Sequence, residues 1–327
     1  MNILFITATR IGDAVLSTGL LGWLIERHPG AEITIACGPA AAPLFSEVPG
    51  LRRVLVVRKR PASLHWLRLW GSCAGRRWDL AVDLRRSALA WFLRAGERRL
   101  PPKSDATVHR VALLGRTLGL DPPPAPRLWT APRHEEAAAR LLPAERPVLA
   151  LAPTANWAAK VWPAERFAEL ARRLTAPGAP LAGAAVMVTG GRGEEALARP
   201  VLEAVPVAQR IDLLGLDLLT TYAVFRRSAL FVGNDSGLMH LAAAAGLPTL
   251  GLFGPTRDEY YAPWGPRGAV LRTGESVEEL TGAADFDHRA PESLMGSLPV
   301  EAVEQAALAL YRRWAEAEGG RKVAESS

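Results

Sequence analysis

Residues 230–244 combine a short apolar run, a polar turn and an alanine-rich stretch, which predicts a strand, a loop and a helix. The turn has the sequence GNDSG, so hydroxyl, amide and carboxylate groups precede the helix. The unpaired N–H groups at a helix N-terminus can bind a pyrophosphate. We therefore expect a phosphate-binding site formed by Asp235, Ser236, Gly237 and His240. The alternative is that Asp235 only caps the helix and His240 is an ordinary helical residue.

A second loop with chemically capable side chains, residues 153–163, follows the apolar run at 149–152. Thr154 and Asn156 offer hydrogen bonds, and Lys160 offers a positive charge that can neutralise a diphosphate leaving group. Loops held by a rigid scaffold commonly carry binding residues. The alternative is that Lys160 is a surface lysine beside the start of a helix.

A third loop, residues 7–14, places Asp13 next to Gly12 at the start of a predicted helix. A carboxylate in this position can act as the general base toward a substrate hydroxyl. Asp is also a frequent helix N-cap, because its carboxylate accepts backbone N–H bonds. The sequence leaves both roles open.

The sequence lacks the motifs of several cofactor sites. The first loop has no G-x-G-x-x-G pattern and the second predicted strand ends at Cys37 without an acidic residue, which argues against NAD. No P-loop pattern occurs. The two cysteines, Cys37 and Cys73, form no C-x-x-C pair, and no Asp, Glu and His cluster has metal-ligand spacing. We expect no cofactor, no metal ion and no disulfide.

Strand-length apolar runs alternate with helical patterns along the chain, which is typical of parallel α/β sheets. The first series of predicted strands is 3–7, 33–37, 54–57 and 80–84, and the second is 148–152, 185–189, 211–213, 230–232 and 249–253. Helices are predicted at 13–28, 135–142, 164–174 and 299–317. Two sheets fit this order better than one. Open parallel sheets bind ligands beyond the carboxyl ends of their strands, and the three loops above follow such ends.

A proline-rich stretch within residues 121–147 separates the two series and predicts a domain boundary. We expect an N-terminal domain at 1–145, a C-terminal domain with a terminal helix at 146–317, and a flexible tail at 318–327.

The composition is that of a globular enzyme, since 49% of the 327 residues are hydrophobic. The longest apolar runs are shorter than the roughly 20 residues that a membrane-spanning helix needs. The N-terminus has neither the basic region nor the cleavage site of a signal peptide. We expect a cytoplasmic location.

Positive charge is concentrated in residues 1–133, which hold 20 Lys and Arg against 9 Asp and Glu, whereas residues 134–327 hold 19 against 24. Such a field attracts phosphorylated lipid surfaces and other polyanions, or is only a solvated arginine-rich face. Trp66 and Trp70 lie in the same part of the chain. They suit a membrane interface or the core side of a helix. Candidate membrane contacts are Arg58, Lys59, Arg60, Arg68, Arg76 and Arg77.

The order and spacing of seven motifs resemble glycosyltransferase family 9, the ADP-heptose:lipopolysaccharide heptosyltransferases. The motifs are IGD at 11–13, WDLAVDL at 78–84, KVWP at 160–163, VTGG at 188–191, GNDSGLMH at 233–240, FGPT at 253–256 and WGP at 264–266. The resemblance implies an α/β fold of GT-B architecture, with two Rossmann-like domains facing an interdomain cleft. The N-terminal domain would bind the acceptor and the C-terminal domain the donor.

The resemblance also implies an inverting, metal-independent transfer of heptose from ADP-heptose to a lipopolysaccharide core or related glycan. Asp13 matches the family's proposed catalytic base, and Thr154 and Lys160 match residues that contact the donor phosphates. The turn and helix start at Asp235, Ser236, Gly237 and His240 match the donor site, and Glu194 or Glu195 matches an acidic residue that binds the ribose. We add Asn156 to the donor contacts and assign Arg10, Arg58 and Arg60 to the acceptor.

The expected partners are therefore a nucleotide-sugar donor and a glycolipid or glycan acceptor, with peripheral association at the cytoplasmic face of the inner membrane and no nucleic acid. Two alternatives remain. One is a GT-B glycosyltransferase or epimerase that uses another sugar nucleotide, and the other is a non-catalytic nucleotide-binding protein.

Overall fold

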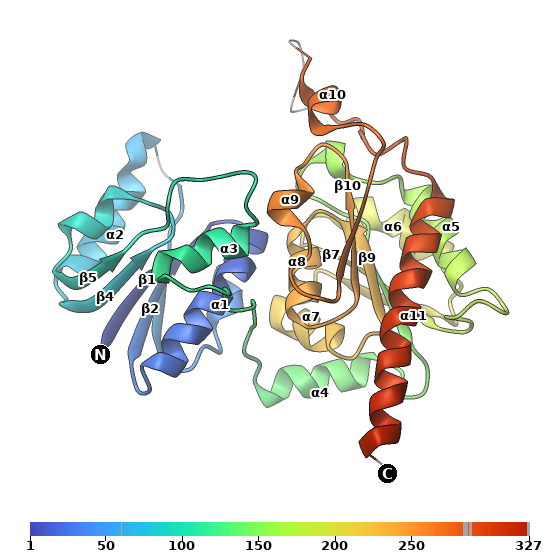
Figure 1. Ribbon diagram of the computed structural model, residues 1–327, viewed down its shortest axis with the longest axis horizontal. Coiled ribbons are helices and arrows are strands. Elements are labelled where there is room, and N and C mark those ends of the chain that lie inside the picture. The colour runs from blue at the N-terminus through green and yellow to red at the C-terminus, as the bar shows by residue number, and fades with distance from the viewer. Residues whose placement is uncertain (60, 284–286, 288–289, 326–327) are drawn as a thin grey trace. The chain divides into compact units, whose positions relative to one another are not determined.

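Apolar segments form the sheet of the N-terminal unit, Met1–Ala131, in the computed structural model (Figure 1). The structure describes residues 1–59, 61–283, 287 and 290–325. Five parallel strands lie in the order β3-β2-β1-β4-β5. They are β1 (Asn2–Ile6), β2 (Glu32–Cys37), β3 (Leu51–Val56), β4 (Trp78–Asp83) and β5 (Ala95–Arg99). Ile3 of the central strand pairs with Ile33 on one side and Leu80 on the other, so β1 is enclosed by its neighbours.

Helices and 3-10 turns connect successive strands of this unit. The helices are α1 (Ile11–Arg27), α2 (Leu64–Ala74) and α3 (Arg110–Gly115), with 3-10 turns η1 (Ala42–Phe45), η2 (Pro61–Ser63), η3 (Ala88–Phe92) and η4 (Arg116–Leu118). Of these elements, α3 and η4 follow the last strand. Helix α1 is buried along most of its length, which explains why its sequence is apolar on more than one side.

The C-terminal unit, Pro132–Ser327, contains a second parallel sheet, in the order β11-β10-β9-β6-β7-β8. Its strands are β6 (Val148–Ala152), β7 (Ala185–Gly190), β8 (Arg210–Leu214), β9 (Leu230–Asn234), β10 (Thr249–Phe253) and β11 (Gly268–Arg272). Its helices are α4 (Pro132–Leu141), η5 (Ala158–Lys160), α5 (Ala164–Leu174), α6 (Glu195–Ala204), α7 (Leu218–Phe225), α8 (Gly237–Ala244), α9 (Asp258–Tyr261), α10 (Val277–Thr281) and α11 (Val300–Glu325). The two sheets predicted from the sequence are both present.

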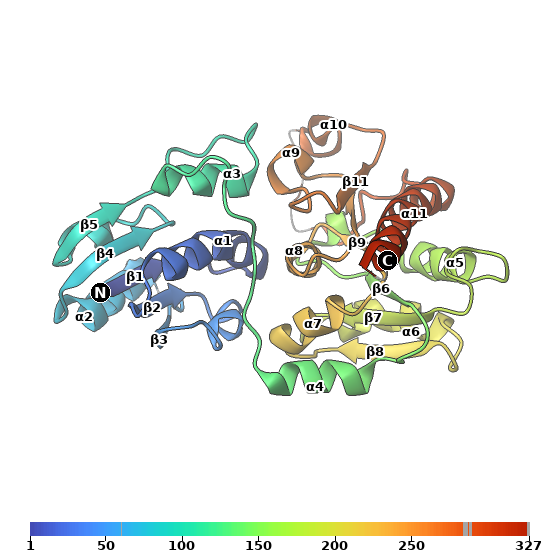
Figure 2. The same cartoon turned by 60° about the horizontal axis from the view of Figure 1, so that its bottom comes forward.

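Helices cover both faces of the second sheet (Figures 1 and 2). On one face α5, α6 and α11 pack against alternate strand residues such as Val188 and Val232 in one core cluster. On the other face Phe225 of α7 contacts Phe231 edge to face, with the ring centroids 5.4 Å apart. This layered arrangement leaves the carboxyl ends of the strands and their loops accessible to ligands.

The boundary between the units lies between Ala131 and Pro132, within the proline-rich stretch at 121–147 that predicted it but before the expected domain limit at 145/146. The reason is that α4, which we expected in the N-terminal domain, packs against α7. Glu135 of α4 pairs with Arg226 at 3.1 Å and with Arg227 at 4.0 Å. Helix α11 continues to Glu325, into the segment expected as a tail at 318–327, whose flexibility stays a prediction.

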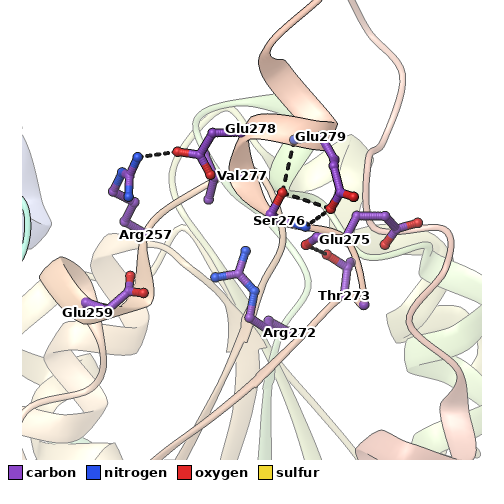
Figure 3. A pocket seen from close by; sticks show the side chains of 10 residues that line it. Arg257, Glu259, Arg272, Thr273, Glu275, Ser276, Val277, Glu278 and Glu279 are labelled. Carbon is purple, nitrogen blue, oxygen red and sulfur yellow. Dashed lines mark hydrogen bonds and ion pairs between the residues drawn. The ribbon is translucent and has the colours of Figure 1, made fainter.

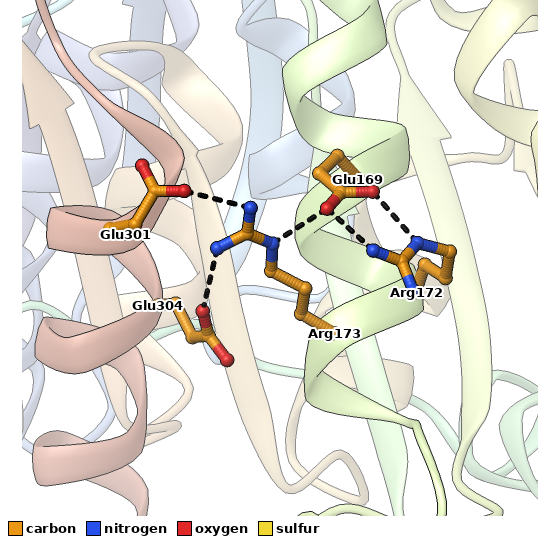
Figure 4. A network of polar contacts seen from close by, with 5 residues as sticks. All are labelled: Glu169, Arg172, Arg173, Glu301 and Glu304. Atoms are coloured by element: carbon orange, nitrogen blue, oxygen red, sulfur yellow. Dashed lines mark hydrogen bonds and ion pairs between the residues drawn. The ribbon is translucent and has the colours of Figure 1, made fainter.

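A network of ion pairs connects α11 to α5 on the surface of the C-terminal unit (Figure 4). Arg173 pairs with Glu169 of its own helix at 2.6 Å, and with Glu301 at 2.7 Å and Glu304 at 3.3 Å on α11. Arg172 pairs with the same Glu169 carboxylate. The hydrogen bonds from the two arginines lower the pKa of Glu169 to about 2. No helix in the described part of the chain combines the length and the apolar composition needed to cross a bilayer.

Candidate functional site

The strand order of the N-terminal unit creates a topological switch point between β1 and β4. From β1 the chain continues to β2 and β3 on one side, and it returns to β4 and β5 on the other. Ligands of open parallel sheets bind at such a point, outside the carboxyl ends of the strands. The loop after β1 leads to Arg10 and Asp13, and β4 ends at Asp83. The switch point therefore lies where the sequence predicted a catalytic carboxylate.

Asp13 is the third residue of α1, and the N-cap is Arg10, so Asp13 does not act as the N-cap. Its side chain is 22% exposed, and its Oδ1 lies 3.8 Å from Nε of Arg110. Arg110 is the first residue of α3, where a positive charge faces the positive end of the helix dipole. The Asp13 carboxylate offsets that repulsion. Arg110 was not singled out from the sequence, because nothing local links it to a residue almost one hundred positions earlier.

The loop that carries Arg10 and Asp13 lies close against its neighbour. A Cβ atom on Gly38, just after β2, would lie only 2.5 Å from Cα of Thr9. Gly38 is therefore needed for the two loops to pack. Behind the loop, the buried hydroxyls of Thr7 and Ser17 are hydrogen bonded at 2.7 Å, which joins the end of β1 to α1. These contacts fix the start of α1 and with it the position of Asp13.

A buried carboxylate organises the loop after β4. Asp83 is fully buried and accepts hydrogen bonds from the N–H of Arg85 at 3.0 Å, the N–H of Ser87 at 2.9 Å and the hydroxyl of Ser87 at 2.6 Å. Burial raises the pKa of Asp83, and these hydrogen bonds limit the rise. The guanidinium of Arg85 lies 5.0 Å from the ring centre of Trp66. Asp83 thus fixes the backbone of the loop that carries Arg85, next to the switch point.

The three predicted acceptor residues have different outcomes. Arg10 is exposed at the start of α1, next to the switch point. Arg58 is exposed after β3, at the edge of the sheet and two strands away from β1. Arg60 lies outside the described residues. Their joint action on one acceptor stays a prediction.

The C-terminal unit has its own switch point, between β6 and β9. From β6 the chain continues to β7 and β8 on one side, and then crosses to β9, β10 and β11 on the other. The loop after β6 carries Thr154 and Lys160, and the loop after β9 carries Asp235 and Ser236. Asn234, which is fully buried, accepts a hydrogen bond from the N–H of Trp162 at 3.0 Å through its Oδ1. This bond fixes the two loops to each other.

Lys160 and Asp235 form an ion pair with little access to solvent. Nζ of Lys160 lies 3.1 Å from Oδ2 of Asp235, and their side chains are 12% and 7% exposed. The same Oδ2 accepts a hydrogen bond at 2.9 Å from the hydroxyl of Thr256, in the loop after β10. Three loops therefore converge on one carboxylate oxygen. Thr256 belongs to a quoted motif, but its role as a partner of Asp235 was not predicted.

Two polar atoms at the start of α8 are buried without a hydrogen-bond partner in the described structure. They are Oγ of Ser236, which is the N-cap residue of the helix, and Nδ2 of Asn234. Gly237 is the first helical residue, and His240 is buried one turn further on, with its ring 6.0 Å from that of Tyr261. Buried polar groups in proteins nearly always have partners. Together with the helix N-terminus, these donors suit an anionic ligand such as a diphosphate.

The remaining predicted donor residues lie around the loops after β6 and β7. Thr154 is buried, and a Cβ atom on Gly190 would come within 3.3 Å of its methyl group. Glu194 accepts a hydrogen bond from the N–H of Gly191 at 2.9 Å. Glu195 accepts hydrogen bonds from its own N–H and that of Gly193, which lower its pKa. Both carboxylates therefore shape their own turn, and Asn156 is exposed.

A polar pocket of about 340 Å³ lies beside this site, between the ends of β10 and β11 and the start of α10 (Figure 3). Arg257, directly after Thr256, pairs with Glu278 across the pocket. Arg272 pairs with Asp258 at 2.6 Å. Ser276 caps α10 in a reciprocal arrangement with Glu279. Charged and hydroxyl groups line the pocket, which suits a hydrated, hydroxyl-rich ligand better than an apolar one.

Comparison with known proteins gives consistent matches. The sequence model of Glycosyltransferase family 9 (heptosyltransferase) matches residues 71–283. Lipooligosaccharide heptosyltransferase 2 of Haemophilus influenzae is 25% identical over 93% of this chain and 98% of its own length. A glycosyl transferase family 9 structure from Veillonella parvula superposes with a TM-score of 0.75 at 21% identity, covering 95% of this chain and 97% of that one. ADP-heptose lps heptosyltransferase II of E. coli gives 0.74 at 22% identity, covering 96% and 99%.

These matches confirm the fold class predicted from the sequence. Each unit is a Rossmann-like parallel α/β domain, and the whole chain has the fold of GT-B glycosyltransferases. Six of the seven motifs on which the resemblance rested lie within the residues that the family model matches, and the IGD motif at 11–13 lies outside them.

Proposed function

The chain belongs to glycosyltransferase family 9, and we propose that this glycosyltransferase moves heptose from ADP-heptose to a lipopolysaccharide core or a related glycan. The donor-side observation that carries the proposal is the group of loops at the β6–β9 switch point. They hold an ammonium, buried hydroxyls and a helix N-terminus together. Relatives named for ADP-heptose and lipooligosaccharide support the choice of donor and acceptor.

We assign the donor diphosphate to the C-terminal unit. Lys160 and the N–H groups at the start of α8 neutralise the charge that develops on the departing diphosphate. The Ser236 hydroxyl and Nδ2 of Asn234, both buried and without a hydrogen-bond partner among the described residues, supply hydrogen bonds to its oxygens. We assign a further hydrogen bond to the Thr154 hydroxyl. These groups supply the positive charge and donors that a metal ion would otherwise provide, so the proposed transfer is metal independent.

We assign the acceptor to the N-terminal unit. The Asp13 carboxylate accepts the proton of the attacking hydroxyl, and Arg110 holds positive charge beside that carboxylate. The hydroxyl oxygen forms the new bond to the anomeric carbon as the bond to the diphosphate breaks on the opposite face. One such displacement inverts the anomeric configuration. The acceptor's own anionic groups would contact Arg10 and Arg58. We place the enzyme at the cytoplasmic face of the inner membrane.

Binding and turnover test the proposal in two steps. A ligand that binds only the folded state at one hundred times its Kd adds about 2.7 kcal/mol to the free energy of unfolding. ADP and ADP-heptose should therefore raise the melting temperature more than UDP, GDP or their sugars. Transfer of heptose from ADP-heptose to heptose-deficient lipopolysaccharide should then follow, with inversion seen by NMR. A preference for a uridine donor, or epimerised donor without transfer, would contradict the proposal in favour of another sugar-nucleotide enzyme.

A further inference from the structure

Two short helices of the N-terminal unit carry half of the ten exposed large hydrophobic side chains in the described part of the chain. Helix α2 carries Leu64, Leu67 and Trp70, and η3 carries Trp91 and Phe92; these five residues are called the apolar patch. Their exposed fractions run from 40% for Trp70 to 71% for Phe92. Single exposed apolar residues are ordinary, whereas a concentration of them marks an interaction surface.

The apolar patch sits on ordered structure. The indole N–H of Trp70 donates a hydrogen bond to the carbonyl oxygen of Phe92 at 3.0 Å, which joins α2 to η3. Underneath, Leu69 of α2 and Leu89 of η3 pack in the same core cluster. Because the core-facing side of each helix is already filled, the exposed side chains are not displaced core residues.

The part of the sequence that carries the apolar patch is rich in basic residues. Residues 51–94 include eleven Lys and Arg but two acidic residues, Asp79 and Asp83, and Asp83 is fully buried. Arg68, directly after Leu67, and Arg94, two residues after Phe92, are both exposed. An apolar surface edged by cations complements an anionic bilayer, whose acyl boundary accepts apolar groups while its headgroups bind arginine.

We propose that the apolar patch inserts into the interfacial region of an anionic bilayer, with Trp91 and Phe92 as anchors and with Arg68 and Arg94 on the lipid phosphates. The inference rests on the proposed function, because a lipid-linked acceptor is presented at such a surface. A tryptophan ring combines a large apolar area with a polar N–H, which favours the membrane interface. If the apolar patches of two copies of the chain packed together, the arginines around each patch would face each other, and their repulsion would disfavour association.

Sedimentation of the full chain with lipid vesicles tests the proposal. Vesicles of phosphatidylcholine alone are compared with vesicles of equal parts phosphatidylcholine and phosphatidylglycerol, at low and at physiological salt. The protein should bind the anionic vesicles, and salt should weaken the binding by screening the arginines. Trp91→Ser combined with Phe92→Ser should reduce binding about tenfold or more. Arg68→Glu and Arg94→Glu should each reduce it by at least about fivefold.

Matched controls lie in the C-terminal unit. Leu197→Ser with Val207→Ser removes two hydrophobic side chains that are 50% and 81% exposed but lie outside the patch. Arg312→Glu reverses an exposed charge on α11. Both control proteins should bind vesicles like the unmodified chain. Equal binding to neutral and anionic vesicles, or equal losses in patch and control variants, would overturn the membrane assignment. So would a self-association that the patch variant abolishes, because it would identify a second copy as the occupant.

The stabilisation by ADP separates this inference from the proposed function. Each patch variant should keep the ADP-dependent rise in melting temperature, since the patch belongs to the other unit from the donor site. If a patch variant loses vesicle binding but keeps the rise in melting temperature with ADP, the result supports the insertion of the apolar patch into the bilayer. Absence of any ADP response in the unmodified chain contradicts the proposed function, whatever the vesicles show.

Discussion

Replacing Lys160 with methionine tests the role of the ammonium group in the proposed donor site. The change keeps most of the side-chain volume but removes the ammonium that lies 3.1 Å from Asp235. Removing one partner of a fully buried ion pair costs about 3–5 kcal/mol. Here the two side chains keep 12% and 7% exposure and Thr256 still donates to Asp235, so we expect about 1–3 kcal/mol. For a domain of this size that lowers the melting temperature by roughly 2–10 °C.

The catalytic effect of Lys160→Met should be larger than the effect on donor binding. In the ground state the ammonium makes a charge-assisted hydrogen bond to the diphosphate, so the affinity for ADP should fall about ten- to a hundredfold. As the glycosidic bond to the diphosphate breaks, more negative charge gathers there and the interaction strengthens. Removal of one such donor typically lowers kcat about 10²- to 10³-fold. The expected loss in kcat/KM therefore exceeds the loss in ADP affinity.

Combining Lys160→Met with Asp235→Asn separates structure from catalysis. The double variant has no unpaired buried carboxylate, so its unfolding free energy should recover toward that of the unmodified chain. Its turnover should stay low, because the positive charge is still missing. Lys103→Met, at an exposed lysine, is the matched control. Urea unfolding, calorimetry with ADP and a transfer assay provide the three readings. If kcat/KM of Lys160→Met stays within a fewfold of normal while its unfolding free energy falls, Lys160 acts only as a counterion of Asp235 and the proposed catalytic role is refuted.

Three further predictions concern other parts of the chain. Asp13→Asn should abolish transfer but leave the affinity for ADP nearly unchanged, because Asp13 lies in the other unit from the donor contacts; near-normal turnover would refute its role as the base. Burial raises the pKa of Cys37 to about 12 and that of Cys73 to about 11, so neither should react with a disulfide reagent at pH 8 until the protein unfolds. The pKa of Glu169 is lowered to about 2, so its contribution to stability should be present above its ordinary pKa and be lost as the pH falls toward 2. Glu169→Gln should flatten the pH dependence of the melting temperature in that window; an unchanged dependence would mean that the network in Figure 4 adds no measurable stability.

Sequence patterns predicted the strands that are buried on both faces and, at the sheet edges, part of β3 and β8, but they missed the edge strands β5 and β11. The runs at 148–152 and 249–253 coincide with β6 and β10, whose residues are all buried. By contrast β5 has the sequence AGERR and β11 the sequence GAVLR, and both are partly exposed edge strands. An edge strand can be stabilised by pairing with one neighbour without presenting a continuous apolar run. Neither strand could be separated from a loop by composition.

The candidate site was predictable where its residues are local and not where they pair across the fold. Thr154, Lys160 and Asp235 stood out because they follow apolar runs, and the structure places all three at adjacent strand ends. Arg110 carries no local signal, and the FGPT motif that contains Thr256 does not indicate a partner, since the contacts of these residues with Asp13 and Asp235 depend on helix and loop packing. The two tryptophans of α2, which were expected to lie together either in the core or at a membrane interface, have different surroundings. Trp66 is half-buried against the core, whereas Trp70 is exposed because Leu69 and Cys73 occupy the core-facing side.

A carboxylate at a proposed diphosphate site needs a physical reason, because Asp235 repels the phosphates that the site is meant to bind. Its contact with Lys160 supplies one. A free lysine side chain loses up to about 2 kcal/mol of rotamer entropy when it is fixed, and here Asp235 has already fixed it. Asp235 also lowers the free-energy cost of holding an ammonium in a nearly closed site before the donor arrives. The pair contributes no net charge at long range, so binding of the diphosphate depends on short-range hydrogen bonds from the Lys160 ammonium, the N–H groups of α8 and the Ser236 and Asn234 donors. Donor selection at this site thus follows from the geometry of fixed donors, whereas the basic surface of the N-terminal unit acts through net charge.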